Sequence, residues 1–301
     1  MTYYTPGDPN WMHHAGKLLC GPIPVSATDP LRSFLANQHK LLHFFGGIFR
    51  LAQRMDQTLD VLFEEQTSES GRPLREGMFQ YEREMRKDQE IIDDLRVMRC
   101  VDHFLTYISQ LLGLLFTENP HMLAHSNSEY KLKDVLRHPD MNAFLRHAAE
   151  SEVRSLSYKG MRELYRDIKG KFGFRIFEDA GDLNFAVEAV AIRNLLVHNN
   201  GIIDSRFSSE VARFKGDEGN KVRSFHATHI ETFFTLAAAD IDERARLKWG
   251  LPAGSAEFSH ECRRFDSVAE NKAKCHHRSC ASSTDRQSRS SQNTDQHRSL
   301  S

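Results

Sequence analysis

The fold class is set by residues 29–65, which read DPLRSFLANQHKLLHFFGGIFRLAQRMDQTLDVLFEE. Apolar side chains recur there every seven residues, and a second set follows four residues after the middle members of the first. The two sets are Phe34, Leu41, Ile48, Met55 and Leu62, and Phe45, Ala52 and Leu59. A stripe with this period predicts one long amphipathic α-helix. Asp29-Pro30 is typical of a helix start, and a cluster of Ser, Gly and Pro after Glu65 predicts the helix end.

A second long helix is predicted over residues 74–117, and Asn119-Pro120 ends it. It carries its own series of apolar residues with a period of seven, reinforced by three further apolar residues. These residues are Ile91, Met98, Leu105 and Leu112, with Val101, Ile108 and Leu115. Two long amphipathic helices joined by a short connection pack as antiparallel neighbours, so we expect a helical hairpin of coiled-coil character.

The rest of the chain also predicts helices, and the expected fold class is all-α. Shorter helical patterns cover residues 130–136, 141–151, 158–169, 183–198 and 228–248. Four prolines interrupt the start of the chain, and Ser, Arg, Gln and His dominate after Gly250. The expected organisation is therefore an irregular lead-in (1–28), a helical hairpin (29–118), a helical domain (119–250) and a disordered tail (251–301).

Composition limits the possible functions. The 301 residues carry a formal net charge of −1, so RNA contact through a general positive field is excluded and any such contact must be local. Five cysteines without a regular framework favour a reducing compartment. The N-terminus lacks a signal-peptide pattern, and the longest apolar run, residues 111–116, is too short to span a bilayer. We therefore expect a cytoplasmic protein without a membrane partner.

No cofactor is expected. The sequence has no Walker-type loop, no Gly-x-Ser-x-Gly elbow and no convincing set of carboxylates for magnesium. The cysteines and histidines after residue 259 lack a paired Cys-x2-Cys arrangement and do not predict a zinc site.

The candidate site lies in residues 191–204, AIRNLLVHNNGIID. Arg193, Asn194 and His198 combine a permanent cation, an amide and an imidazole that titrates near neutral pH. Asp182 is a predicted N-cap for their helix, and Asn199-Asn200-Gly201 predicts that the helix stops beside His198.

The Arg-to-His spacing alone carries no information, because it also occurs from Arg32 to His39 and from Arg223 to His229. The amide residue and the helix end distinguish the segment around Arg193. At about 100° per residue, Asn194 and His198 lie roughly 40° apart, whereas Arg193 lies about 140° from His198. The two reach a common phosphate only if the arginine curls back or a second copy supplies the missing group, as in a symmetric dimer.

The segment RNLLVHNNG resembles the Arg-x4-6-His motif of the HEPN superfamily, the higher eukaryote and prokaryote nucleotide-binding domains. The resemblance covers about fifteen residues directly, and residues 151–248 by helical organisation. It implies an all-α domain that dimerises and cleaves RNA without a metal, in a defence or toxin–antitoxin setting with an antitoxin or other protein partner. By the same resemblance, His198 moves a proton during attack of a ribose 2′-hydroxyl, Arg193 holds the phosphate and Asn194 orients one of them.

A second interpretation is a non-catalytic interaction protein. In it the long hairpin provides the dimer or partner surface, and the motif is structural. His198 then caps the helix end, and Arg193 pairs with Glu188 or another acidic residue.

Overall fold

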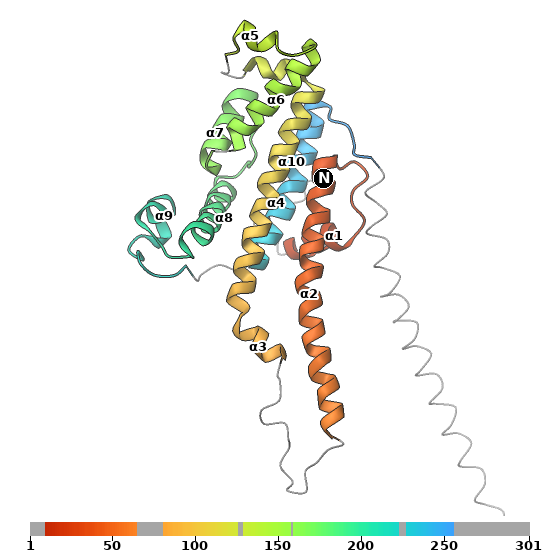
Figure 1. Cartoon of the computed structure of the whole chain (residues 1–301), viewed down its shortest axis with the longest axis vertical. Helices are drawn as coiled ribbons and strands as arrows, with labels where there is room; N and C mark the ends of the chain where they lie inside the picture. The colour runs from red at the N-terminus through yellow and green to blue at the C-terminus, as the bar shows by residue number, and fades with distance from the viewer. Residues whose placement is uncertain (1–9, 65–80, 126–128, 158, 223–226, 256–301) are drawn as a thin grey trace, which may run out of the picture. The chain divides into compact units, whose positions relative to one another are not determined.

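The chain is all-α, as predicted (Figure 1). The computed structural model describes residues 10–64, 81–125, 129–157, 159–222 and 227–255. Within these ranges every regular element is a helix, and one isolated antiparallel bridge joins Ile202 to Lys221. The expected disordered tail lies outside the described residues from residue 256 onward.

Ten α-helices and two 3-10 helices make up the described part of the chain. They are α1 (Trp11–Cys20), α2 (Asp29–Glu64), α3 (Tyr81–Lys87), α4 (Gln89–Glu118), η1 (Pro120–His125), α5 (Leu132–Val135), α6 (Met141–Ser157), α7 (Met161–Phe172), α8 (Ala180–Asn199), α9 (Ser205–Glu210), η2 (Ala212–Phe214) and α10 (Ala227–Trp249). The expectation of an irregular lead-in needs correction at α1. Prolines flank this segment without interrupting it, so it forms a helix that buries Ala15 and Leu18.

The helical hairpin forms as the apolar pattern predicts. α2 begins at Asp29 and ends at Glu64, and it packs along α4. The second arm is broken at Asp88 into α3 and α4, although the sequence predicted one helix. Asp56 of α2 accepts hydrogen bonds from the first backbone N–H groups of α3, Tyr81 N and Glu82 N, at 2.8 and 2.9 Å, and so caps that helix from across the hairpin.

α4 is the centre of the molecule and belongs to both the hairpin and the bundle that follows it. It contacts α2, α6, α8 and α10, and Phe104 at its middle is fully buried. The Phe104 ring lies 4.3 Å from the Phe234 ring, centroid to centroid, and 6.5 and 6.3 Å from those of Phe34 and Phe177. The expected boundary at residue 118 therefore does not separate two cores, and residues 10–254 share one compact unit.

α4 is also the one helix in the described residues that is long and apolar enough to cross a membrane by length and composition. Ten of its side chains are buried among the other helices. The central helix of a helical bundle has the same properties, so this observation does not make α4 a membrane span.

The segment before α2 is held to α10 by a buried carboxylate. The Thr28 hydroxyl and backbone N–H both donate to Asp242, the backbone bond at 3.1 Å. Burial raises the pKa of Asp242 above its ordinary value, while the bonds from Thr28 oppose that rise. A carboxyl with a raised pKa binds more protons in the folded than in the unfolded chain, so its contribution to stability is lost as pH rises through the folded pKa.

We expect Asp242→Asn to change the pH dependence of stability. The free energy of unfolding of the wild type should fall relative to that of the variant as pH rises from about 4 towards neutrality, because only the wild type must ionise a buried group. Urea unfolding at several pH values measures this difference. Asp217→Asn, on an exposed turn, is the control and should keep the wild-type profile. If the free energies of unfolding of wild type and Asp242→Asn change with pH in parallel, the prediction is wrong.

Candidate functional site

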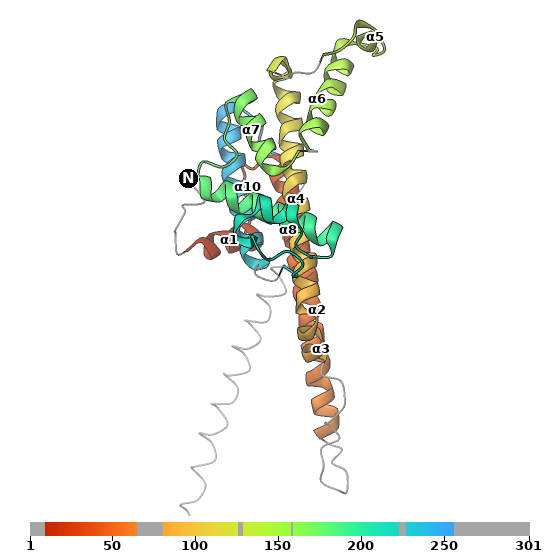
Figure 2. The same ribbon diagram turned by 90° about the vertical axis from the view of Figure 1, so that its left-hand side faces the viewer.

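The candidate site is built on α8, which runs across α4 (Figure 2). The N-cap of the helix lies three residues before the predicted cap, Asp182. Asp179 is the N-cap, and its carboxylate accepts from Gly181 N at 2.6 Å and from Asp182 N at 3.3 Å. Both aspartates are competent caps, and the earlier one forms the bonds.

The helix stops where the sequence predicts. Asn200 has φ 51°, the left-handed conformation that ends a helix, and Gly201 follows with φ 77°. Gly201 N donates to Leu195 O at 3.1 Å, and the Asn199 side-chain amide donates to Ile202 O at 2.5 Å. A Cβ at Gly201 would lie 3.3 Å from the Leu196 side chain, so this turn needs glycine both for its conformation and for space.

Arg193 faces α4 and is held by two partners. Its Nη2 lies 2.7 Å from Asp102 Oδ1, and its Nη1 donates to Asn194 Oδ1 at 2.9 Å. Its Nε is buried and has no hydrogen-bond partner among the described residues. The predicted alternative partner, Glu188, instead pairs with Arg213. The guanidinium is therefore fixed in direction through two of its five N–H donors.

His198 lies apart from Arg193 and is exposed, as is Asn194. The His198 ring makes no hydrogen bond to another described residue, so it does not cap the last carbonyls of α8. The structure thus brings Arg193 and Asn194 together and leaves His198 in solvent. One protomer does not bring Arg193 and His198 to a common point, which agrees with their separation around the helix.

Asp102 is the residue that sequence reasoning missed. It lies on α4, far from Arg193 along the chain, and a lone aspartate on a predicted amphipathic helix gives no signal of its partner. The neighbouring His103 was also missed. Burial lowers the pKa of His103, as does the positive charge of Arg99, and its Nδ1 is buried without a hydrogen-bond partner in the described part of the chain.

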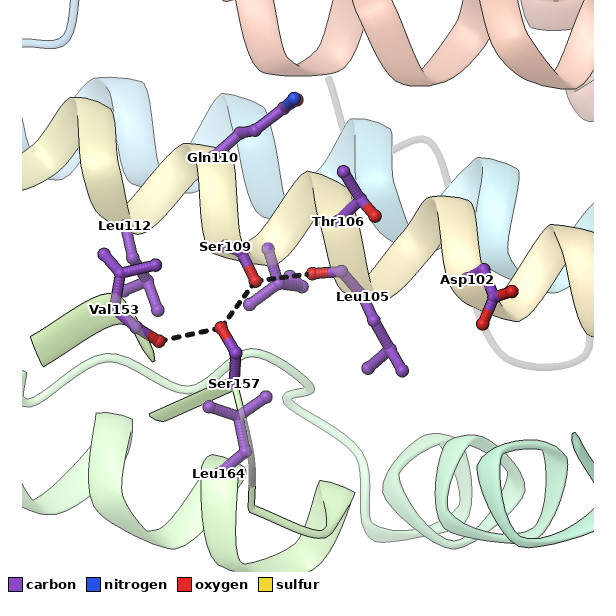
Figure 3. Close-up of a pocket in the computed structure, with 10 residues that line it drawn as sticks. Asp102, Leu105, Thr106, Ser109, Gln110, Leu112, Val153, Ser157 and Leu164 are labelled. Carbon is purple, nitrogen blue, oxygen red and sulfur yellow. Dashed lines mark hydrogen bonds between the residues drawn. The ribbon is translucent and has the colours of Figure 1, made fainter. Parts of the chain in front are cut away.

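An open groove begins at Asp102 and continues along α4 (Figure 3). Its volume is about 620 Å³, and its walls come from α4, α6 and α7. Half of the ten lining residues are leucine, isoleucine or valine, and the other half carry hydroxyl, amide or carboxylate groups. At its middle the Ser109 and Ser157 hydroxyl oxygens lie 2.8 Å apart, and each also lies within hydrogen-bond distance of a carbonyl oxygen of its own helix, so two hydroxyl protons serve three contacts. The two serines are therefore bonded within the groove, and Ile108, Leu112 and Leu164 of its walls are buried.

The Arg193–Asp102 pair gives a testable stability effect. Both side chains are partly exposed, at 25% and 33%, so we expect a coupling energy of about 1 kcal/mol or less. A double-mutant cycle with Arg193→Ala, Asp102→Ala and both together, followed by urea unfolding, measures it. The Arg137–Asp134 pair on the surface is a matched control and should show weaker coupling. Equal coupling in the two pairs would mean that Asp102 does not hold Arg193.

No family model matches the chain, and neither a curated protein nor a solved structure was found to match it. Among the described residues, no three His, Cys, Asp or Glu side chains lie close enough together to hold a metal ion.

Proposed function

We propose that the chain is a metal-independent endoribonuclease with a composite site formed by two copies. The observation that carries the proposal is the end of α8, where His198 and Asn194 are exposed one turn apart and the Arg193 guanidinium is fixed beside Asn194. An imidazole suits proton transfer near neutral pH, and a guanidinium suits a phosphate because it donates two parallel hydrogen bonds. The resemblance to HEPN domains supports the same assignment.

The chemistry is attack of a ribose 2′-oxygen on the adjacent phosphorus. His198 accepts the 2′-hydroxyl proton as the new O–P bond forms, and the bond from phosphorus to the 5′-oxygen of the next nucleotide breaks. His198 then gives this proton to the leaving 5′-oxygen, and the products are a 2′,3′-cyclic phosphate and a 5′-hydroxyl. Arg193 neutralises the charge that develops on the phosphorane oxygens, and Asn194 holds the guanidinium in position.

A second copy is needed because of where the side chains point. Arg193 is directed to α4 by Asp102, while His198 faces solvent about 140° further round the helix. A symmetric dimer supplies Arg193 from one protomer and His198 from the other. The proposal includes RNA as substrate, a cytoplasmic location, and a defence or toxin–antitoxin setting with an antitoxin as a further partner.

A second candidate function is a non-catalytic interaction protein. The Arg193–Asp102 ion pair favours it, because the carboxylate already neutralises the cation that a phosphate would use. In this case the motif holds α8 to α4 and the molecule acts through its surfaces.

Cleavage of total RNA in EDTA separates the two functions. The endoribonuclease is expected to produce fragments with 2′,3′-cyclic phosphate ends in the absence of divalent metal. A non-catalytic interaction protein leaves the RNA intact. Intact RNA after incubation with the dimeric protein would reject the enzymatic proposal. Cleavage that requires added magnesium would reject its mechanism.

A further inference from the structure

The groove along α4 takes no part in the chemistry proposed above. Asp102 lies at one end of it and Leu112 lies towards the other, with Ser109 and Ser157 between them (Figure 3). Its volume of about 620 Å³ lies in the range of pockets that hold small organic groups. The charge and the hydrogen-bonding groups of its lining decide which kind of group fits there.

The lining does not suit an anion. Among the described residues, no Lys, Arg or His lines the groove, and its carboxylate, Asp102, is paired with Arg193. A phosphate inside the groove would meet this carboxylate and no cation of the walls. The aliphatic side chains suit a neutral group with apolar faces, and Leu105 and Val153 are only partly buried by the rest of the chain.

The serine pair at the middle of the groove offers hydrogen-bond acceptors. The Ser109 and Ser157 oxygens lie 2.8 Å apart, and each contacts a carbonyl oxygen of its own helix, Leu105 O at 2.9 Å and Val153 O at 2.7 Å. Two hydroxyl protons serve these three contacts. In every arrangement of the protons, at least one of the two hydroxyl oxygens therefore accepts no hydrogen bond from another described residue. When both protons go to the carbonyls, both oxygens can accept from a ligand.

In the proposed ribonuclease site, Arg193 holds the phosphate at the Asp102 end of this groove. Arg193 Nη2 lies 2.7 Å from Asp102 Oδ1, and Ser109 follows Asp102 by seven residues on α4. Seven residues of a helix span about 10 Å along its axis. This span is comparable to the length of one nucleotide from its phosphate to the outer edge of its base. A phosphate at Arg193 therefore brings a neighbouring base within reach of the serine pair.

We propose that the groove binds the nucleobase beside the scissile phosphate, and that the serine pair accepts hydrogen bonds from an exocyclic amino group of that base. The inference rests on the proposed function, which supplies single-stranded RNA as the substrate. The aliphatic walls cover the faces of the base, and the two N–H bonds of the amino group go to the two serine oxygens. The groove lies within one protomer, so base binding does not require the second copy.

The serine pair discriminates cytosine from uracil. The two bases have nearly the same shape, and cytosine carries an amino group where uracil carries a carbonyl oxygen. That carbonyl oxygen would face a hydroxyl oxygen unless a serine gave up its bond to the helix carbonyl. An acceptor left without a donor is costly, so the groove favours the base with the amino group.

Binding of RNA analogues that cannot be cleaved tests the proposal on the full-length protein. Oligocytidine and oligouridine of equal length with 2′-O-methyl groups lack the attacking 2′-hydroxyl, so fluorescence anisotropy in EDTA measures affinity without cleavage. The wild type is expected to bind oligocytidine about 10-fold more tightly than oligouridine, because the serine pair bonds only the amino group. Equal affinities, or no binding of either oligonucleotide, would overturn the proposal.

Substitution of the serine pair tests which groups read the base. Ser109→Ala/Ser157→Ala is expected to bind the two oligonucleotides about equally, because both acceptors are removed. Ser155→Ala removes an exposed serine from the same helix as Ser157, so it is the matched control and should keep the preference for oligocytidine. Circular dichroism of each variant shows that the chain is folded. If the double variant keeps the wild-type preference, the serine pair does not read the base.

Failure of this proposal is distinguishable from failure of the proposed function. Cleavage of RNA in EDTA by a protein that binds the two oligonucleotides equally would support the ribonuclease and reject the base site. Preferential binding of oligocytidine by a protein that leaves RNA intact would support the base site and reject the ribonuclease.

Discussion

His198→Ala is expected to lower the rate of RNA cleavage in EDTA by a factor of about 10² to 10⁴, which is the range that a positioned acid or base contributes. The His198 side chain is exposed and makes no hydrogen bond to another described residue, so its removal leaves the fold unchanged. The rate should be measured on a defined RNA under single-turnover conditions, where product release does not limit it.

The matched control is His121→Ala. His121 is an exposed histidine on η1, and its substitution removes an imidazole of the same kind far along the chain from α8. It should cleave at the wild-type rate. Undiminished cleavage by His198→Ala would show that the activity comes from another group or from a contaminating nuclease.

Phe104→Ala is expected to lower the free energy of unfolding by about 3–5 kcal/mol. Phe104 is fully buried, and its ring meets the aromatic rings of α2, α10 and the segment before α8. Removal of the ring leaves a cavity where all these elements meet, so the whole unit should lose stability together. Urea unfolding followed by circular dichroism measures the change.

Leu247→Ala provides the control for that substitution. Leu247 is 68% exposed on α10, so we expect a change within about 0.5 kcal/mol. Phe104→Leu should fall between the two because it keeps part of the apolar volume. A loss below about 1 kcal/mol for Phe104→Ala would mean that α4 is not the shared centre of the hairpin and bundle. Two separate unfolding transitions would mean that residues 29–118 and 119–250 have separate cores.

The long helices could be predicted because their signals are local. The seven-residue apolar period and Asp29-Pro30 define α2, and the Asn-Asn-Gly sequence defines the end of α8. The break at Asp88 could not be predicted in this way. The capping of α3 depends on Asp56, which lies on the opposite arm of the hairpin. Pattern alone also could not choose between Asp179 and Asp182 as the cap of α8, since both residue types cap helices equally well.

The candidate site could be predicted only as a set of residues. The sequence indicated that Arg193 and His198 point in different directions, and the structure has them apart. It could not supply Asp102, because that contact joins two helices that the chain brings together only on folding.

The central claim is that two protomers share the site at the end of α8, and mixing two inactive variants tests it directly. Arg193→Ala and His198→Ala should each fail to cleave RNA in EDTA. After the two are mixed and allowed to exchange subunits, the mixed dimer holds one site with both groups intact. Cleavage should then return to about one quarter of the wild-type rate, since about half the dimers are mixed and each has one of two sites. If the exchanged mixture remains as inactive as its components, Arg193 and His198 do not form a shared site.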